Sequence, residues 1–222
     1  MDWTALRLSL LLGLWTLALL LPAAIWIGRW LAYSEFRGKS LIEAMLALPL
    51  VLPPTVLGFY ILIATGGSST LGRIWQSIFG GPLAFSFEGL VFASLIANLP
   101  FAIQPIQQAF AAIPRDLREA AACCGLSPWR GFRLIELPLA WPGLLTAAVL
   151  TFAHTLGEFG VVLMVGGSIP GETRTIAIAI YDRVQAFDDQ AAGLMAAALL
   201  VFSLGAIAAT TALSKRIGRR HG

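Results

Sequence analysis

His154 and Glu158 form the one pair of ionisable residues that share a helix face within a charge-poor stretch of this chain. They are four residues apart, so both side chains would lie on the same side of a helix. Acid–base catalysis would need a larger cluster of such groups, and the sequence has none. We therefore expect Glu158 to orient a neighbouring group or to close a gate, paired with His154 or with a backbone donor.

Other reactive side chains are few. The chain has no G-x-x-x-x-G-K-[ST] phosphate-binding sequence, so we do not expect it to hydrolyse ATP. The two cysteines, Cys123 and Cys124, are adjacent and cannot join distant segments, and without clustered histidines they are too few for a zinc site. We expect no enzymatic activity, no metal and no cofactor in this chain.

The composition places these residues in a membrane. Of 222 residues, 58% are hydrophobic and only 12% are charged, with a mean hydropathy of +0.80. A soluble domain carries about 25% charged residues. The balance excludes an ordinary cytosolic enzyme, a disordered chain and a secreted disulfide scaffold. The net charge of +3 does not indicate nucleic-acid binding, because the basic residues lie between long apolar runs.

Five runs without Asp, Glu, Lys or Arg predict an all-α polytopic bundle with five membrane crossings. A crossing needs about 20 residues, so five or six fit this length, but a sixth run is not found. Of the 15 basic residues, 11 fall in the two loops and the tail that would share one side, which predicts an outside N-terminus and a cytoplasmic C-terminus. The runs are 8–28, 44–64, 89–114, 137–157 and 190–214.

Polar residues and prolines mark where these spans could line a path. Prolines remove a backbone donor, so they kink or break a helix, and such breaks belong where a helix faces protein or a cavity. For each polar residue, hydrogen bonding between helices is the alternative to lining a path. The candidates for a gate or path are Pro53, Pro54, Thr55, Asn98, Thr151, His154 and Glu158. Residues 69–79 and 176–187 predict two short amphipathic helices in the outer interface.

Residues 114–138 predict two short helices at an angle on the cytoplasmic side. Asp116 is a plausible N-cap for the first, and Gly125 is placed to end it in a left-handed conformation. Ser127 and Pro128 would then cap and start the second. The small surface of Ala120 and Ala121 permits close approach by another protein, and the surrounding Arg and Glu residues can fix its register.

The spacing in this segment resembles the EAA signature of ABC-importer permeases. The segment matches that signature at every position: Glu119-Ala120-Ala121, then three residues, Gly125, nine residues, Ile135, one residue and Leu137-Pro138. The resemblance implies a type I ABC permease domain at 8–214, coupling helices at 115–133 that dock on a cytoplasmic ATPase, and a short basic tail at 215–222. The implied coupling residues are Arg115, Asp116, Arg118, Glu119, Ala120, Ala121, Gly125, Ile135, Leu137 and Pro138.

Two further segments resemble the molybdate branch of that family. They are residues 48–58, LPLVLPPTVLG, and 156–160, LGEFG, the latter followed by 169–175, IPGETRT. The resemblance implies a permease homodimer with two ATPase subunits that bind the ATP, and an external, periplasmic molybdate-binding protein, at the inner membrane. A sulfate or tungstate permease is the alternative with the same architecture, and a secondary anion transporter is the rival of a different class.

A dianion cannot dissolve in hydrocarbon, so it needs a wet path. No Lys or Arg lies deep within a predicted span, and a path must bind its substrate weakly enough to release it. We therefore expect hydroxyls, amides and backbone to line a path of low affinity, with recognition left to the external protein.

Overall fold

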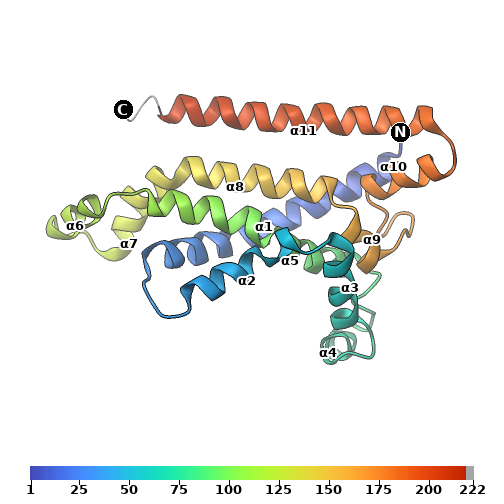
Figure 1. Cartoon of the computed structure of the whole chain (residues 1–222), viewed down its shortest axis with the longest axis horizontal. Coiled ribbons are helices and arrows are strands. Elements are labelled where there is room, and N and C mark those ends of the chain that lie inside the picture. The colour runs from blue at the N-terminus through green and yellow to red at the C-terminus, as the bar shows by residue number, and fades with distance from the viewer. Residues whose placement is uncertain (219–222) are drawn as a thin grey trace.

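The structure is a computed structural model that describes residues 1–218, with side chains as far as 208 except at position 206. Every regular element in this part of the chain is helical. Figure 1 shows α1, α5, α8 and α11 running side by side, with α6 and α7 at one end and α9 and α10 at the other. The helices are α1 (Trp3–Tyr33), α2 (Lys39–Val51), α3 (Pro54–Thr65), α4 (Thr70–Phe79), α5 (Phe87–Ala111), α6 (Arg115–Cys123), α7 (Pro128–Gly131), the π-helix η1 (Phe132–Glu136), α8 (Leu137–Gly157), α9 (Gly160–Gly166), α10 (Ile176–Gln185) and α11 (Asp189–Gly218).

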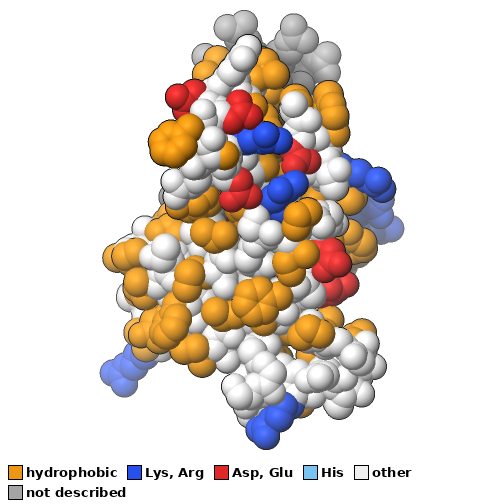
Figure 2. Space-filling view, turned by 90° about the vertical axis from the view of Figure 1, so that its right-hand side faces the viewer, with side chains coloured by type: hydrophobic (Ala, Val, Ile, Leu, Met, Phe, Trp, Pro, Cys, Tyr) orange, Lys and Arg blue, Asp and Glu red, His pale blue; other side chains and the backbone are white. Residues whose placement is uncertain are grey.

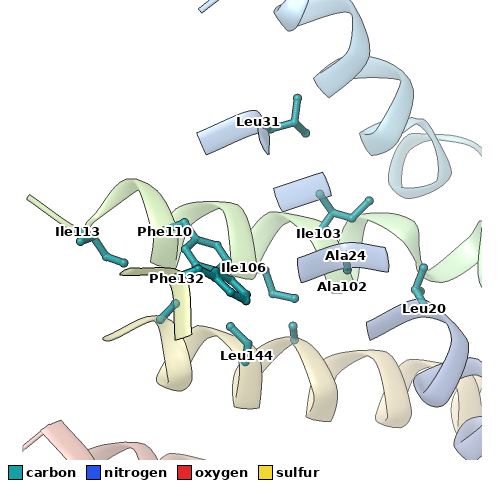
Figure 3. Close-up of a cluster of buried hydrophobic side chains, with 12 residues drawn as sticks. Leu20, Ala24, Leu31, Ala102, Ile103, Ile106, Phe110, Ile113, Phe132 and Leu144 are labelled. Atoms are coloured by element: carbon teal, nitrogen blue, oxygen red, sulfur yellow. The ribbon is translucent and has the colours of Figure 1, made fainter. Parts of the chain in front are cut away.

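The core lies where α1, α5 and α8 cross. Leu31, Ile106 and Phe110 are fully buried there, and small residues such as Ala24 and Ala140 let the helices approach closely. Figure 3 shows this cluster with Phe132 of η1 next to Phe110. In a membrane, where lipid is as apolar as leucine, close packing of small residues is what holds helices together.

Gly143 predicts a measurable stability effect at this crossing. A Cβ there would lie 2.3 Å from the Cβ of Ala109 and 2.8 Å from the carbonyl oxygen of Pro105. Gly143→Val should therefore overpack the contact between α5 and α8, at about 1–3 kcal/mol. We expect the thermal midpoint of the purified permease to fall by about 2–12 °C, since 1 kcal/mol shifts it by about 2–4 °C in a chain of this size. Gly157→Ala, where a Cβ meets nothing within 4 Å on the same helix, is the control and should leave the midpoint unchanged.

Three predicted crossings are long continuous helices. α1, α5 and the continuous helical stretch Pro128–Gly157 are long and apolar enough to span a membrane. The fourth-span prediction of 137–157 coincides with α8, because the run is bounded by Glu136 and Glu158. The predicted fifth crossing falls in α11, whose described apolar part is Asp189–Gly205. The predicted basic tail at 215–222 lies outside the described side chains.

The second predicted crossing is broken at its proline pair. Residues 44–64 were predicted as one span that its prolines kink or break, and α2 and α3 are two helices bent by 110° at a break. The break follows Leu52, because Pro53 and Pro54 deny the helix two consecutive backbone donors. Pro100 and Pro105 break nothing, since α5 continues through both. A proline pair, and not a single proline, is what divides a helix here.

Both segments that were predicted to be short amphipathic helices are helical. α4 starts after Ser69, whose hydroxyl accepts from the backbone N–H of Gly72, as expected. In α10 the buried residues are Ile176, Ile178 and Ala179, whereas Val184 is exposed and Phe187 lies beyond the helix, 91% exposed. The helix predicted over 176–187 therefore ends two residues early, at Gln185, and α10 packs against α1, α8 and α11.

Ion pairs hold the end of the molecule that carries α10. Arg174 pairs with Asp2 at 2.8 Å, which ties the loop before α10 to the N-terminus of α1. Arg183 pairs with Asp188 at 3.1 Å. Figure 2 looks onto this end, where acidic and basic side chains intermix in the upper part and hydrophobic side chains spread over the middle.

Candidate functional site

The Ala-rich helix α6 begins two residues earlier than the capping prediction. Its N-cap is Pro114 with no side-chain hydrogen bond, so Asp116 is not the N-cap but lies in the first turn. A carboxylate still favours the N-terminal turn electrostatically there. Arg115 and Glu119 pair across one turn at 2.6 Å. The prediction for the helix end is confirmed, since Gly125 has φ +76° directly after the C-cap Cys124.

The second predicted short helix is not a separate element. Ser127 caps it and Pro128 starts it as expected, with the Ser127 hydroxyl accepting from the backbone N–H of Arg130. However, α7 has only four residues and continues through η1 directly into α8. Ile135 therefore lies in the π-helix, and Leu137 and Pro138 form the first turn of α8. The segment is one short helix and one long helix that enters the membrane bundle.

An apolar strip is exposed on α6. Leu117, Ala120 and Cys124 recur at intervals of three and four residues, so they share a face, and all three are exposed. Ala121, between them in sequence, is 8% exposed and faces the rest of the segment, where its carbonyl accepts from the N–H of Leu126. A flat face built around Ala120 can receive another protein without moving the permease backbone.

The structure also reveals a contact that sequence reasoning missed. Arg29 of α1 forms two hydrogen bonds to the carboxylate of Glu136, at 2.6 and 3.1 Å. The first charge-free run ends at residue 28 and so predicts Arg29 in a loop, whereas Arg29 lies within α1. The available signal was Glu136 itself, a charge set between Ile135 and Leu137, which requires a partner once buried.

Three of the predicted path residues form a hydrogen-bonded cluster between α5 and α8. Asn98 is fully buried and donates from Nδ2 to the hydroxyl of Thr155 at 3.0 Å and to the carbonyl of Ser94 at 2.8 Å. Its Oδ1 lies 3.1 Å from Nδ1 of His154, whose ring stacks on Phe101. His154 Nε2 is 3.5 Å from Glu158 Oε2, so the predicted pairing of these two residues is present.

Glu158 joins two helices. It is 7% exposed, and its Oε1 accepts from the backbone N–H of Val161 at 2.9 Å, in the first turn of α9. Glu158 thus meets both partners that the sequence suggested, the histidine and a backbone donor. Its position lets it hold the end of α8 and the start of α9 in one arrangement.

The broken second crossing meets α9 beside this cluster. A Cβ on Gly160 would lie 2.7 Å from the Cβ of Pro54 and 3.3 Å from the backbone nitrogen of Thr55. Pro53, Pro54 and Thr55 are exposed on the other side. Thr151 is fully buried in α8, and its hydroxyl has no hydrogen-bond partner in the structure. The predicted residues therefore gather around the junction of α3, α5, α8 and α9, with Thr151 one helical turn further along α8.

Long helices in one bundle, with an Ala-rich helix exposed at one end just before the start of a spanning helix, are typical of the membrane subunits of binding-protein-dependent transporters. The chain belongs to the family described as "Binding-protein-dependent transport system inner membrane component", whose model matches residues 21–219. It is therefore a multi-pass transport component of the inner membrane and not an enzyme.

Curated relatives cover nearly the whole chain. The molybdenum transport system permease protein ModB of Azotobacter vinelandii is 48% identical over 91% of this chain and 89% of its own length. The protein of the same name from Haemophilus influenzae is 38% identical over 100% of this chain and 97% of its own. The sulfate transport system permease protein CysT of Escherichia coli is more distant, at 30% identity over 84% of this chain and 67% of its own length.

A solved structure supports the fold. The bacterial alginate ABC transporter, solved in complex with an alginate pentasaccharide-bound periplasmic protein, has a chain that superposes with a TM-score of 0.75 at 18% identity, covering 96% of this chain and 78% of its own. At that identity the likeness bears on the fold alone. The fold is that of the type I ABC importer permeases.

Proposed function

We propose that this chain is the membrane-spanning permease subunit of an ATP-driven importer and that its substrate is molybdate. The observation that carries the proposal is the exposed apolar strip of α6, held between the two membrane-spanning helices α5 and α8. The substrate rests on the relatives, since those at 48% and 38% identity are named as molybdenum permeases and the sulfate permease is at 30%.

We infer the partners of the permease from the surfaces that remain exposed in the single chain. An ATPase subunit that binds the ATP docks on α6 of each copy, and a periplasmic molybdate-binding protein delivers the anion on the opposite side. A second permease copy completes the path. In support of a dimer, α2 buries no residue in the single chain and exposes Leu41, Met45 and Val51.

The N-terminus lies outside and the C-terminus in the cytoplasm. The arrangement in Figure 1 supports this orientation, because the N-terminus lies at the end of the bundle opposite α6 and α7. The docking helix must face the ATPase, so the opposite end faces outward. The two arginines of α6 and those at 130 and 133 lie at the inner end, as the positive-inside rule requires.

The proposed path is polar, and the described residues place no free cation near its centre. Arg29 lies inside α1, but both of its hydrogen bonds go to Glu136, so it is not available to hold an anion. Further inward, Gln104, Gln107 and Gln108 of α5 line a cavity of about 320 Å³ beside Glu43, whose carboxylate accepts from Gln107 at 2.6 Å. Amides and hydroxyls bind an oxyanion weakly enough to release it.

A competition assay tests the substrate. The permease is reconstituted in liposomes with its ATPase and binding protein, and uptake of radioactive molybdate is measured with unlabelled tungstate or sulfate in excess. We expect tungstate to compete, because it has the same charge and nearly the same size, and sulfate to compete weakly. Stronger inhibition of molybdate uptake by excess sulfate than by excess tungstate would instead identify a sulfate permease.

A further inference from the structure

One face of α1 contacts every part of the coupling segment, which comprises α6, α7 and η1. Trp26, Arg29 and Tyr33 are three and four residues apart, so they form a single strip along the inner end of the helix. Together they contact all three elements of the segment: Trp26 contacts α7 and η1, Arg29 contacts η1, and Tyr33 contacts α6. No other helix of the bundle is joined to all three elements by ring contacts or ion pairs in the described part of the chain.

Arg29 makes the central contact of this strip. Its guanidinium binds both carboxylate oxygens of Glu136, at 2.6 and 3.1 Å, and its Cζ lies 5.4 Å from the ring centroid of Phe132. Glu136 is only 6% exposed. A bidentate Arg–carboxylate pair fixes both distance and orientation, so it resists sliding of α1 along η1.

Aromatic contacts join α1 to the coupling segment on either side of Arg29. Trp26 stacks on Phe132 at 5.2 Å and on Trp129 of α7 at 6.1 Å between ring centroids. At the other end of the strip, the guanidinium of Arg118 in α6 lies 3.7 Å from the ring centroid of Tyr33. Stacked rings and a cation over a ring both prefer one geometry. The strip therefore ties α6, α7 and η1 to α1 as one unit.

The coupling segment is connected to α8 through the chain itself, whereas its connection to α1 is made by side-chain contacts. The coupling segment enters α8 through the π-helix Phe132–Glu136. Such π-turns are rare, and they occur frequently at functional sites within helices. The segment is thus joined to α8 through an irregular turn and to α1 through a bidentate ion pair and stacked rings.

We propose that Arg29 and Glu136 make α1 the helix that moves with the coupling segment, so that ATPase closure reaches the path through α1 as well as α8. Arg29 is then a positioning residue whose loss uncouples ATP hydrolysis from transport. The inference rests on the proposed function, because it requires an ATPase that pulls on α6.

The test is the amount of molybdate taken up per ATP hydrolysed, in liposomes with the ATPase and the binding protein. The double variant Arg29→Met, Glu136→Leu removes both charges together, so no buried carboxylate is left unpaired. We expect it to assemble with the ATPase and to hydrolyse ATP, with uptake per ATP at least fivefold lower than that of the wild type. A permease that is merely less stable would lose both activities in proportion, and the ratio would not change.

Arg37→Met is the matched control, since Arg37 is exposed in the turn after α1, and it should leave the ratio unchanged. If the double variant does not assemble, Arg29→Lys decides, because a lysine can keep the charge but not the bidentate contact. It should lower the ratio at least twofold. The inference is overturned if the double variant takes up as much molybdate per ATP as the wild type does. If the double variant does not assemble, the same result in Arg29→Lys overturns it. No ATP-dependent uptake by the wild-type complex would refute the proposed function instead.

Discussion

Ala120→Phe should abolish most transport while leaving the permease folded. Ala120 lies in the middle of the exposed apolar strip of α6, where nothing in the permease covers it. A phenyl ring there would hold the docking surface away from the ATPase, since interfaces reject bulk that they were not shaped to receive. We expect ATPase binding to weaken by about 100-fold, which corresponds to about 2.7 kcal/mol. Copurification of the ATPase with tagged permease measures it.

Ala122→Phe is the control for this substitution. It makes the same change in the same helix, two residues on, but Ala122 faces a cavity shared with Tyr33 and Lys39 and not the strip of Leu117, Ala120 and Cys124. ATPase binding should stay within threefold of the wild type. Equal binding by the Ala120 and wild-type proteins would show that the ATPase does not dock on this strip.

Glu158→Gln should impair transport without impairing assembly. The amide oxygen of glutamine can still accept from the N–H of Val161, so the start of α9 stays capped. What is lost is the negative charge 3.5 Å from His154 Nε2. If this pair closes the path at the junction of α8 and α9, we expect uptake to fall about tenfold, which corresponds to about 1.4 kcal/mol. Uptake is measured in liposomes at equal amounts of assembled complex.

Two comparisons isolate the charge at position 158. Glu158→Leu removes the cap as well, so it should lower both the yield of folded permease and its uptake. Glu172→Gln removes an exposed carboxylate in the loop before α10 and should leave uptake unchanged. Normal uptake by Glu158→Gln would assign Glu158 to helix capping alone.

The features that could be predicted are those that depend on neighbouring residues. The end of α8 follows from the charge at Glu158, and the end of α6 follows from Gly125, because each is decided within a few residues. The proximity of His154 and Glu158 required only helical spacing. The N-cap was predicted two residues too late, at Asp116, because the helix already begins after Pro114.

The features that could not be predicted depend on distant contacts. Arg29 and Glu136 are 107 residues apart, and only the packing of α1 against η1 brings them together. Asn98 and His154 meet for the same reason across α5 and α8. Pro53 and Pro54 indicate a break, but the angle of 110° is set by how α3 packs on α9. The π-helix at 132–136 has no local signal in its five residues.

The most direct test of the central claim is whether uptake requires ATP and the partner subunits. Molybdate uptake is measured in liposomes that contain the permease alone, the permease with its ATPase, and the permease with the ATPase and the binding protein, each with and without ATP. The account predicts substantial uptake only in the complete complex with ATP. Uptake by the permease alone, unchanged by ATP, would identify a secondary transporter and contradict the account.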